Sequence, residues 1–236
     1  CYIGRFFQAL LFDADPTQNN LADLRIRRCV AVDSFRCATD GHPEGMYIGG
    51  ANGVLVEECL FDHNGWSETI PGANPTVFRH NIYIQTNCTN VTTRGIISAR
   101  AGATGMQQRP GGLCENHLFL QNPLGIVFGT GGTLRNCVVM DSRDIDPTNP
   151  DLTRGIGIQL SGGVNSEVTG NICAWRTKPA TWNLVAFSLD GAVQGCNFHD
   201  NIVWKWWIDG CYGSRGVQLA GAPSGWLSFR NNAIQQ

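Results

Sequence analysis

Short segments of alternating apolar and polar residues recur along the chain. Each starts at a glycine and is followed, after a small turn, by a second apolar run. The five clearest pairs are Gly45–Ile48 with Cys59–Phe61, Gly105–Gln108 with His117–Phe119, Gly125–Phe128 with Cys137–Val139, Gly155–Ile158 with Asn171–Cys173, and Gly216–Leu219 with Asn232–Ile234. Strict alternation predicts β-strands, and no segment shows the spacing of an amphipathic helix. A strand unit that repeats in this way predicts a solenoid.

One position, the residue just before the second apolar run, marks each repeat. It is occupied in turn by Cys29, Cys59, Gly95, His117, Cys137, Asn171, Asn201 and Asn232. One interval is one coil, so the strands pair with the coils above and below and form a parallel β-helix of about seven to eight coils.

The side-chain period of two along a strand predicts which residues face the core. The inward residues are Ile82, Ile84, Met106, Ile126, Phe128, Ile156 and Ile158, and the outward residues are Tyr83, Gln85, Gln107, Arg109 and Gln159. Gln108 falls at an inward position, which means either an error in the register or a buried amide with a partner.

The composition suits many tight turns between short strands. The chain of 236 residues has 29 glycines, 15% charged residues and a formal net charge of −2. This charge provides no polybasic surface for nucleic acid, and no apolar run approaches the roughly 20 residues of a membrane span. We therefore expect one β-helix domain over residues 1–236. Both ends look uncapped, so we also expect a segment of a longer chain.

Ten cysteines are present, but the chain is far longer than small disulfide scaffolds. Cys29, Cys59 and Cys137 fall at the same repeat position, and free cysteine packs as a small hydrophobe, so we predict a buried column. No Cys-x-x-Cys pair exists, and no zinc site is predicted. The sequence requires no cofactor, although oxygen ligands in the acidic segment 141–151 leave calcium open.

The coil pattern resembles the right-handed parallel β-helix superfamily typified by pectate and pectin lyases. The resemblance covers nearly the whole chain and includes the turn phrases Arg135–Val138 and Thr169–Ile172. It implies a right-handed helix. Members of the superfamily include polysaccharide lyases, glycoside hydrolases, C5-epimerases of uronic-acid polymers and phage tailspikes, so the resemblance is specific for fold and weak for activity.

Coil length varies in one half of the repeat only. The stretch from the glycine-led strand to the next anchor is steady, whereas the other half is long before Asn81 and Gly155 and short before Gly105 and Gly125. Insertions on one turn of a solenoid commonly mark its binding face. We predict a trough whose floor is residues 98–109 and 120–129 and whose walls are the loops 63–79 and 141–154.

Polar and aromatic side chains are expected to line this trough. Those predicted to bind substrate are His63, Trp66, Gln85, Gln107, Gln121 and Asp141, with Asp144 and Asp146 beside them on the second wall. Aromatic rings stack on sugar faces, while amides and arginine hydrogen-bond hydroxyls and carboxylates. Asp62 is adjacent to His63, but neighbouring strand residues face opposite sides, so no dyad is expected.

Three residues could carry β-elimination on a uronic acid. The reaction needs a cation against the carboxylate, a base for the C5 proton and an acid for the leaving oxygen. Arg109 is the candidate cation, and His80 or Tyr83, one coil earlier, could supply base and acid. An epimerase would use the same set and return the proton from the opposite face. Each residue also has a structural interpretation: His80 could cap a turn, Tyr83 could cover the sheet and Arg109 could bind turn carbonyls.

Other chemistry remains open. Carboxylate pairs for hydrolysis are available among Asp141, Asp144, Asp146 and Asp151. A lysine-base mechanism would have to use Lys178 or Lys205. The tryptophans Trp204, Trp206 and Trp207 could form a second sugar platform or a contact between subunits of a homo-oligomer.

The leading hypothesis is a carbohydrate-active protein that acts on an acidic polysaccharide as a lyase or C5-epimerase. We expect it outside the cell, at the cell surface or on a virion. The first alternative is a solenoid that binds glycans or a receptor without catalysis, as a phage tailspike or bacterial surface protein does. The second is a purely structural scaffold.

Overall fold

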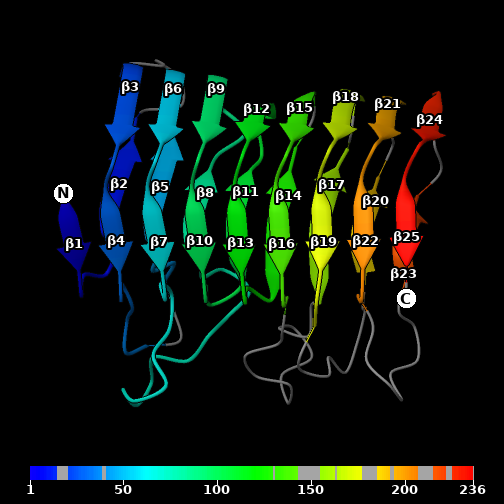
Figure 1. Cartoon of the computed structure of the whole chain (residues 1–236). Helices are drawn as coiled ribbons and strands as arrows, with labels where there is room; N and C mark the ends of the chain where they lie inside the picture. The colour runs from blue at the N-terminus through cyan, green and yellow to red at the C-terminus, as the bar shows by residue number, and fades with distance from the viewer. Residues whose placement is uncertain are drawn as a thin grey trace.

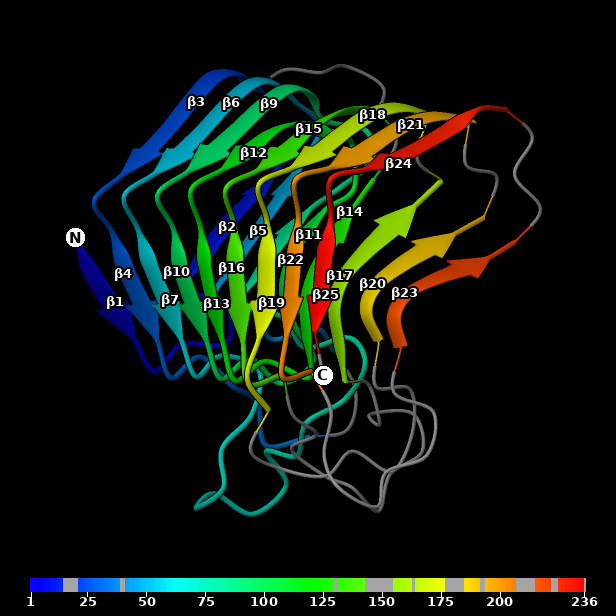
Figure 2. The ribbon, with the colours of Figure 1, turned by 45° about the vertical axis from the view of Figure 1, so that its right-hand side comes forward.

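The computed structural model describes residues 1–14, 21–38, 41–129, 131–142, 155–162, 164–176, 185–191, 194–206, 215–221 and 225–235. In this part of the chain there is no helix, and all strands pair in parallel within three sheets. Figure 1 shows the strands of successive coils side by side, and Figure 2 shows the three sheets wrapped around a common core. The predicted all-β parallel β-helix is confirmed.

The sheets are named A, B and C in the order in which each coil crosses them. Sheet A has nine strands: β1 (Tyr2–Gly4), β4 (Val30–Val32), β7 (Leu60–Asp62), β10 (Ile97–Ala99), β13 (Leu118–Leu120), β16 (Val138–Met140), β19 (Ile172–Ala174), β22 (Ile202–Trp204) and β25 (Ala233–Gln235). Sheet B has eight: β2 (Leu10–Asp13), β5 (Met46–Gly49), β8 (Ile82–Ile84), β11 (Thr104–Gln108), β14 (Leu124–Phe128), β17 (Ile156–Ser161), β20 (Val185–Asp190) and β23 (Arg215–Ala220). Sheet C also has eight: β3 (Leu21–Arg27), β6 (Ala51–Glu57), β9 (Thr89–Arg94), β12 (Gly112–Glu115), β15 (Gly132–Arg135), β18 (Val164–Thr169), β21 (Gln194–His199) and β24 (Leu227–Arg230).

Inward side chains of the three sheets form one continuous apolar core. The predicted inward residues of sheet B stack in register, with Met106 on β11 between Ile82 on β8 and Ile126 on β14. All three are fully buried, as are Ile84, Phe128 and Ile158. Ile156, at the start of β17, is only partly buried.

Gln108 is buried with partners, so its inward register is correct. Its Oε1 accepts a hydrogen bond of 2.6 Å from Thr93 Oγ1, and its Nε2 donates to the carbonyl oxygens of Gly111 and Leu113. Its neighbours along the column are the apolar Ile84 and Phe128, so the amide does not continue a ladder. Its hydrogen bonds instead go to carbonyl groups of its own coil and to the hydroxyl of Thr93 on β9, in the preceding coil.

The anchor position is the residue that precedes each strand of sheet A. Backbone hydrogen bonds of 2.8 to 2.9 Å connect it from coil to coil, for example from Leu118 N to Ile96 O and from Val138 N to His117 O. The predicted anchor Gly95 is therefore wrong by one residue, because Ile96 takes this position. Of the predicted cysteine column, Cys59 and Cys137 are buried and Cys29 is half-buried.

The anchor column ends in an asparagine ladder. Asn171 Nδ2 donates to Asn201 Oδ1, and Asn201 Nδ2 donates to Asn232 Oδ1, each at 3.0 Å. Backbone N–H groups of the column donate to the same oxygens: Asn171 N to Asn201 Oδ1 at 3.0 Å and Asn201 N to Asn232 Oδ1 at 2.9 Å. Buried amides are satisfied in this way by the repeat itself.

Packing between sheets explains the glycine that starts the repeat. A Cβ added at Gly125 would lie 2.5 Å from the carbonyl oxygen of Gly157 and 2.7 Å from Cγ1 of Val139. In the next coil the strand register puts Gly157 at this position, so the predicted start at Gly155 is wrong by two residues; the atoms nearest to an added Cβ at Gly157 would include Sγ of Cys173, at 2.7 Å. Sheet B approaches the next coil and sheet A closely at this position, so a larger residue would collide with both.

Every long connection leaves sheet A for sheet B. The segment between β7 and β8 spans residues 63–81, whereas those between β10 and β11 and between β13 and β14 span only 100–103 and 121–123. The long loop extends beyond the ends of the sheet A strands in Figure 1. The predicted arrangement of two short coils beside a long loop is confirmed, while residues 143–154 of the second wall lie outside the described residues. No helix in the described part could cross a membrane.

Candidate functional site

Aromatic and amide side chains follow one another along the outer face of sheet B. Tyr47 on β5, Tyr83 on β8 and Gln107 on β11 are in register, one per coil. The rings of Tyr47 and Tyr83 are nearly parallel, with centroids 5.6 Å apart and 12° between their planes. Neighbouring strands lie about 4.8 Å apart, so the register itself brings these rings into contact.

Arg109 directly follows β11 and turns back over Tyr83. Its Nη1 donates a hydrogen bond to Tyr83 Oη, and its guanidinium carbon lies 5.7 Å from the centroid of that ring. The side chain of Arg109 is exposed, whereas Tyr83 is half-buried. Gly129, in the next coil, approaches the Arg109 backbone closely, because a Cβ there would lie 1.7 Å from the carbonyl oxygen of Arg109. Two of the three predicted catalytic residues are thus in direct contact.

His80, the third predicted catalytic residue, lies behind this pair. It precedes β8, is 2% exposed, and stacks on the Tyr83 ring with centroids 5.5 Å apart. Gln107 Nε2 lies 3.1 Å from His80 Nε2, so the amide donates and the imidazole nitrogen accepts. This burial suits a residue that positions Tyr83 better than one that touches a substrate.

A pocket of about 360 Å³ opens beside Tyr83. Its lining includes Leu11, Asp13, Glu44, Tyr47, Tyr83 and Gln85. Asp13 and Tyr47 converge above Gly49, where an added Cβ would lie 3.0 Å from Asp13 Oδ1 and 3.1 Å from Tyr47 Oη. Burial and the Asp13 charge raise the pKa of Tyr47, while a hydrogen bond from Gln85 opposes this. Gln85, a predicted substrate-binding residue, therefore lines the pocket.

Sequence reasoning missed Glu44. The side chain is 1% exposed, and its Oε2 has no hydrogen-bond partner among the described residues. Burial raises the pKa of Glu44 to about 9, so the carboxyl is uncharged at neutral pH. A signal was present in the repeat: the register of Met46 with Ile82 places Glu44 at the coil position of His80.

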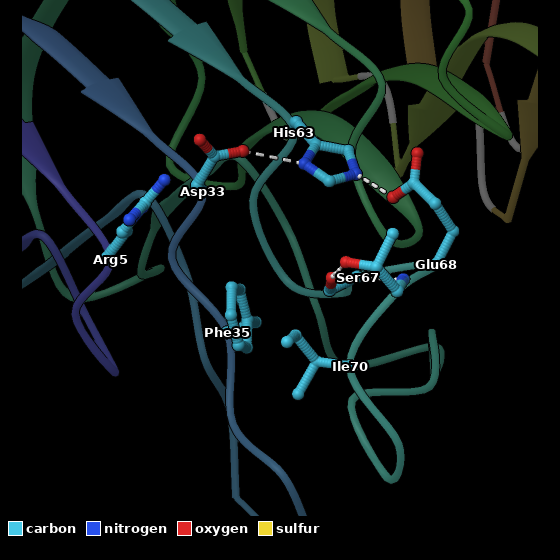
Figure 3. A pocket seen from close by; sticks show the side chains of 8 residues that line it. Arg5, Asp33, Phe35, His63, Ser67, Glu68 and Ile70 are labelled. Carbon is cyan, nitrogen blue, oxygen red and sulfur yellow. Dashed lines mark hydrogen bonds and ion pairs between the residues drawn. The ribbon is translucent and has the colours of Figure 1, made fainter.

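A second pocket, of about 510 Å³, lies at the corner where sheet A ends. There His63 Nδ1 contacts Asp33 Oδ1 at 2.8 Å, and His63 Nε2 contacts Glu68 Oε2 at 2.7 Å, as the dashed lines in Figure 3 show. Trp66 packs edge-on against His63, with ring centroids 4.9 Å apart. Asp62 pairs with Arg100 instead, as expected for a residue on the opposite side from His63.

The remaining predicted substrate-binding residues form another contact at the same corner. Gln121 Nε2 donates to Asp141 Oδ2 at 3.3 Å, and Asp141 is 6% exposed. His63, Gln121 and Asp141 directly follow β7, β13 and β16, with φ values of 56°, 57° and 52°. The predicted set is therefore divided between the outer face of sheet B and the corner after sheet A. Asp144, Asp146 and Asp151 lie outside the described residues.

One group in the described part could in principle hold a metal ion: Cys114, His117 and Cys137, whose ligand atoms lie within 4.8 Å of one another. All three are buried, and burial raises the pKa of the Cys114 thiol and lowers that of His117 to about 3. Both imidazole nitrogens are already engaged, Nδ1 by the N–H of Ile96 and Nε2 by Thr93 Oγ1. Since this hydrogen-bond network is complete, the cluster fits the core better than a metal centre.

The predicted row of exposed tryptophans is wrong for Trp206. This residue is 3% exposed and packs in the core, with the Arg176 guanidinium 5.6 Å from its ring centroid. Trp204 is half-buried and meets Trp175 edge-on at 5.7 Å, while Lys205 Nζ lies 4.6 Å from the Trp204 ring centroid. Trp207 and Lys178 lie outside the described residues.

No protein-family model, curated protein or solved structure matches the chain. The fold defines the class as a parallel β-helix, and a fold of this kind hosts many functions. The outer face of sheet B, with its stacked tyrosines, exposed arginine and buried neutral carboxyl, is therefore the basis for a functional assignment.

Proposed function

We propose that the protein is a carbohydrate-active β-helix that binds an acidic polysaccharide on the outer face of sheet B and acts on it by β-elimination or C5-epimerisation. The observation that supports this most strongly is the hydrogen bond from Arg109 to Tyr83 Oη at the edge of the pocket. It places a cation and a phenolic oxygen together on an open face. The resemblance of the coil pattern to pectate lyase-like proteins agrees with this proposal.

Both reactions begin with removal of the proton at C5 of a uronic acid. In the proposed mechanism Arg109 binds the carboxylate and stabilises the negative charge that develops on it. Tyr83 Oη, as phenolate, takes the proton. In elimination the C5–H electron pair forms the C4=C5 double bond and the C4–O bond breaks, and Tyr83 returns its proton to the leaving oxygen. In epimerisation a water molecule on the opposite face protonates C5, and the hydroxide that remains is neutralised by the proton held on Tyr83.

His80 and Gln107 serve this mechanism by orientation. The stacked imidazole fixes the plane of the Tyr83 ring, and the Gln107 amide holds the imidazole. Positioning groups of this kind act because a small displacement of a reacting atom is costly to the rate. His80 is therefore assigned a positioning role, while Arg109 and Tyr83 are assigned catalytic roles.

The alternative is glycan binding without chemistry. The parallel rings of Tyr47 and Tyr83 favour it, because stacked aromatics beside amides form a platform for sugars whether or not a reaction follows. A tailspike-like or cell-surface binding protein would use the same face. Both functions place the protein outside the cell or on a virion.

The experiment that separates the two is a screen of pectate, alginate and glycosaminoglycans for unsaturated uronate products by ultraviolet absorbance, and for epimers by NMR. Tyr83→Phe removes only the phenolic oxygen, and we expect it to abolish product formation. Tyr2→Phe is the matched control, since it removes the phenolic oxygen of an exposed tyrosine on β1 of sheet A, and we expect it to retain turnover. Full turnover in Tyr83→Phe would remove Tyr83 from the mechanism. Binding without product in the wild type would leave the glycan-binding alternative.

A further inference from the structure

The two ends of the candidate site differ in charge. Arg109 lies on the coil of β11, and Asp13 ends β2, three coils earlier. At about 4.8 Å per coil these strands are on the order of 14 Å apart. Arg109 reaches back to Tyr83 Oη on β8 and Asp13 Oδ1 lies beside Gly49 on β5, so their charged ends face neighbouring coils. Tyr47 and Tyr83 occupy the coils between them. A polymer that lies across this face therefore meets a cation at one end and a carboxylate at the other.

The pocket at the acidic end is poorly suited to a second uronate. The Asp13 side chain is exposed, and no ion pair within the described residues neutralises it. A sugar carboxylate in this pocket would be repelled by Asp13, whereas sugar hydroxyls can donate hydrogen bonds to it.

Glu44 is the complementary group in the same pocket. The side chain is almost completely buried in the pocket wall, and no group in the described part of the chain hydrogen-bonds its Oε2. A buried polar group without a partner costs free energy, and a ligand oxygen that fills the pocket can offset this cost. A neutral carboxyl supplies an O–H donor, as Asp13 supplies an acceptor.

We propose that this pocket is a subsite for a sugar that carries no free carboxylate, next to the uronate held at Arg109. Asp13 accepts hydrogen bonds from its hydroxyls, the Glu44 O–H donates to one of its oxygens, and Leu11 and Tyr47 cover its apolar face. The preferred polymer thus alternates acidic and neutral sugars. This inference rests on the proposed function, because Arg109 sets the position of the acidic sugar.

The first test compares two probes by calorimetry: a chondroitin hexasaccharide without sulfate, in which uronate and N-acetylhexosamine alternate, and hexagalacturonate, in which every sugar is acidic. We expect the wild type to bind the alternating probe at least about tenfold more tightly, a difference of about 1.4 kcal/mol. Asp13→Asn removes the repelling charge and should tighten binding of hexagalacturonate severalfold. The ratio of the two affinities should therefore decrease. Equal affinities in the wild type, or an unchanged ratio in Asp13→Asn, would overturn the inference.

The second test isolates Glu44 by pH. The other titratable groups that line the pocket are Asp13, His42, Tyr47 and Tyr83. Affinity of the wild type for the alternating probe should fall as the pH rises through about 9, where Glu44 ionises. Glu44→Gln keeps all the other groups and stays neutral, so its affinity should match the wild type at pH 7 and fall less above pH 9. Identical pH profiles would overturn the role of Glu44.

The outcomes for the two proposals are distinct. If the alternating hexasaccharide binds with the expected preference but is not converted, the catalytic proposal is wrong and the subsite proposal stands. Conversion with no effect of Asp13→Asn or Glu44→Gln would remove the subsite and leave the catalytic proposal. If neither probe binds, both proposals fall. Glu58→Gln, which changes an exposed acid in the turn before sheet A, is the control and should alter neither affinity.

Discussion

The outer faces of sheets B and C are built from the same coils, but they differ in whether their charged side chains are paired. On sheet C one column alternates in sign from coil to coil, through Arg27, Glu57, Arg94, Glu115 and Arg135. Glu57 binds both Arg27 and Arg94, and these arginines lower the pKa of Glu57, chiefly through the hydrogen bond from Arg94. Glu115 pairs with Arg135 at 2.6 Å. Most charges of this column are neutralised within the protein.

Two polar groups beside the pocket on sheet B have no ion-pair partner among the described residues. Glu44 has a buried oxygen that no described group hydrogen-bonds, and Arg109 is exposed and contacts Tyr83. Charged groups that are paired within a ladder have few hydrogen-bonding positions left for a ligand. Unpaired groups around a pocket keep these positions and can bind one. The comparison shows that the number of charged residues says little about function, because their partners decide what each can do.

The largest expected difference between the two faces is in turnover. Arg109→Ala should lower turnover of the best substrate by a factor of roughly 10² to 10³, because the developing charge loses its fixed cation. Arg135→Ala, a matched change on sheet C, should leave turnover unchanged. Initial rates measure both, and thermal unfolding confirms that both variants fold. A similar loss in both variants would refute the functional distinction between the faces.

The second largest expected difference between the two faces is in how protein stability depends on pH. The pKa of Glu44 rises from its ordinary 4.5 to about 9 on folding, so its contribution to stability is complete below about pH 4.5 and is lost as the pH rises through about 9. Glu44→Gln should therefore gain stability relative to the wild type between pH 5 and 9. At about 1.4 kcal/mol per pH unit the gain should reach several kcal/mol.

Urea unfolding at pH 5 and pH 8.5 measures this effect. Glu57→Gln on sheet C is the control: Arg94 and Arg27 lower the pKa of Glu57, so its contribution to stability is present above its ordinary pKa of 4.5 and this variant should show no gain between pH 5 and 8.5. A difference between wild type and Glu44→Gln that does not change with pH would show that Glu44 is charged in the folded state.

A smaller effect is expected for the network that joins the two faces from inside. Thr93 lies inward at the end of β9, and its hydroxyl connects His117 to Gln108 of sheet B. Thr93→Val keeps the shape but leaves two buried polar partners unsatisfied, so the free energy of unfolding should fall by about 1–3 kcal/mol. Chemical denaturation measures this loss. Thr92→Val, on the outer side of the same strand, should cost less.

The smallest effect should come from the charge ladder itself. Arg27→Gln removes one of the two arginines that pair with Glu57. The Arg27 side chain is more than half exposed and Glu57 keeps Arg94, so the loss should stay within about 1 kcal/mol and shrink at high salt. Denaturation at low and high ionic strength would show this. A loss of several kcal/mol that salt does not reduce would mean that the ladder on sheet C is more than a solvated structural feature.

Much of the fold was predictable because a solenoid repeats one local rule. The alternation around Ile82, Met106 and Ile126 gave the inward positions, and the unequal intervals gave the side on which the loops leave. The predicted anchor position was wrong at Gly95, because this glycine takes the turn position, with φ of 62°, and Ile96 fills the core. Trp206 was placed outside for a similar reason: its side chain turns into the core at the start of a loop, where strand alternation no longer applies.

The site was predictable only where it follows the strand register. Tyr83, Gln107 and Arg109 could be placed on one face from alternation, and the structure brings them together with His80. Glu44 lies in a loop, and the pocket that it lines takes Leu11, Tyr47 and Tyr83 from three successive coils. The partner of His63 was also hidden, since Asp33 comes from the preceding coil.

The sequence by itself determined that this chain is a parallel β-helix, because an apolar period of two repeated in every coil can be buried in no simpler way. It also determined which residues share the outer face of sheet B. Only the tertiary structure decided which charges are paired and which are left for a ligand. Burial and the stacking of coils set those partners, and both depend on distances across the solenoid that no local pattern encodes.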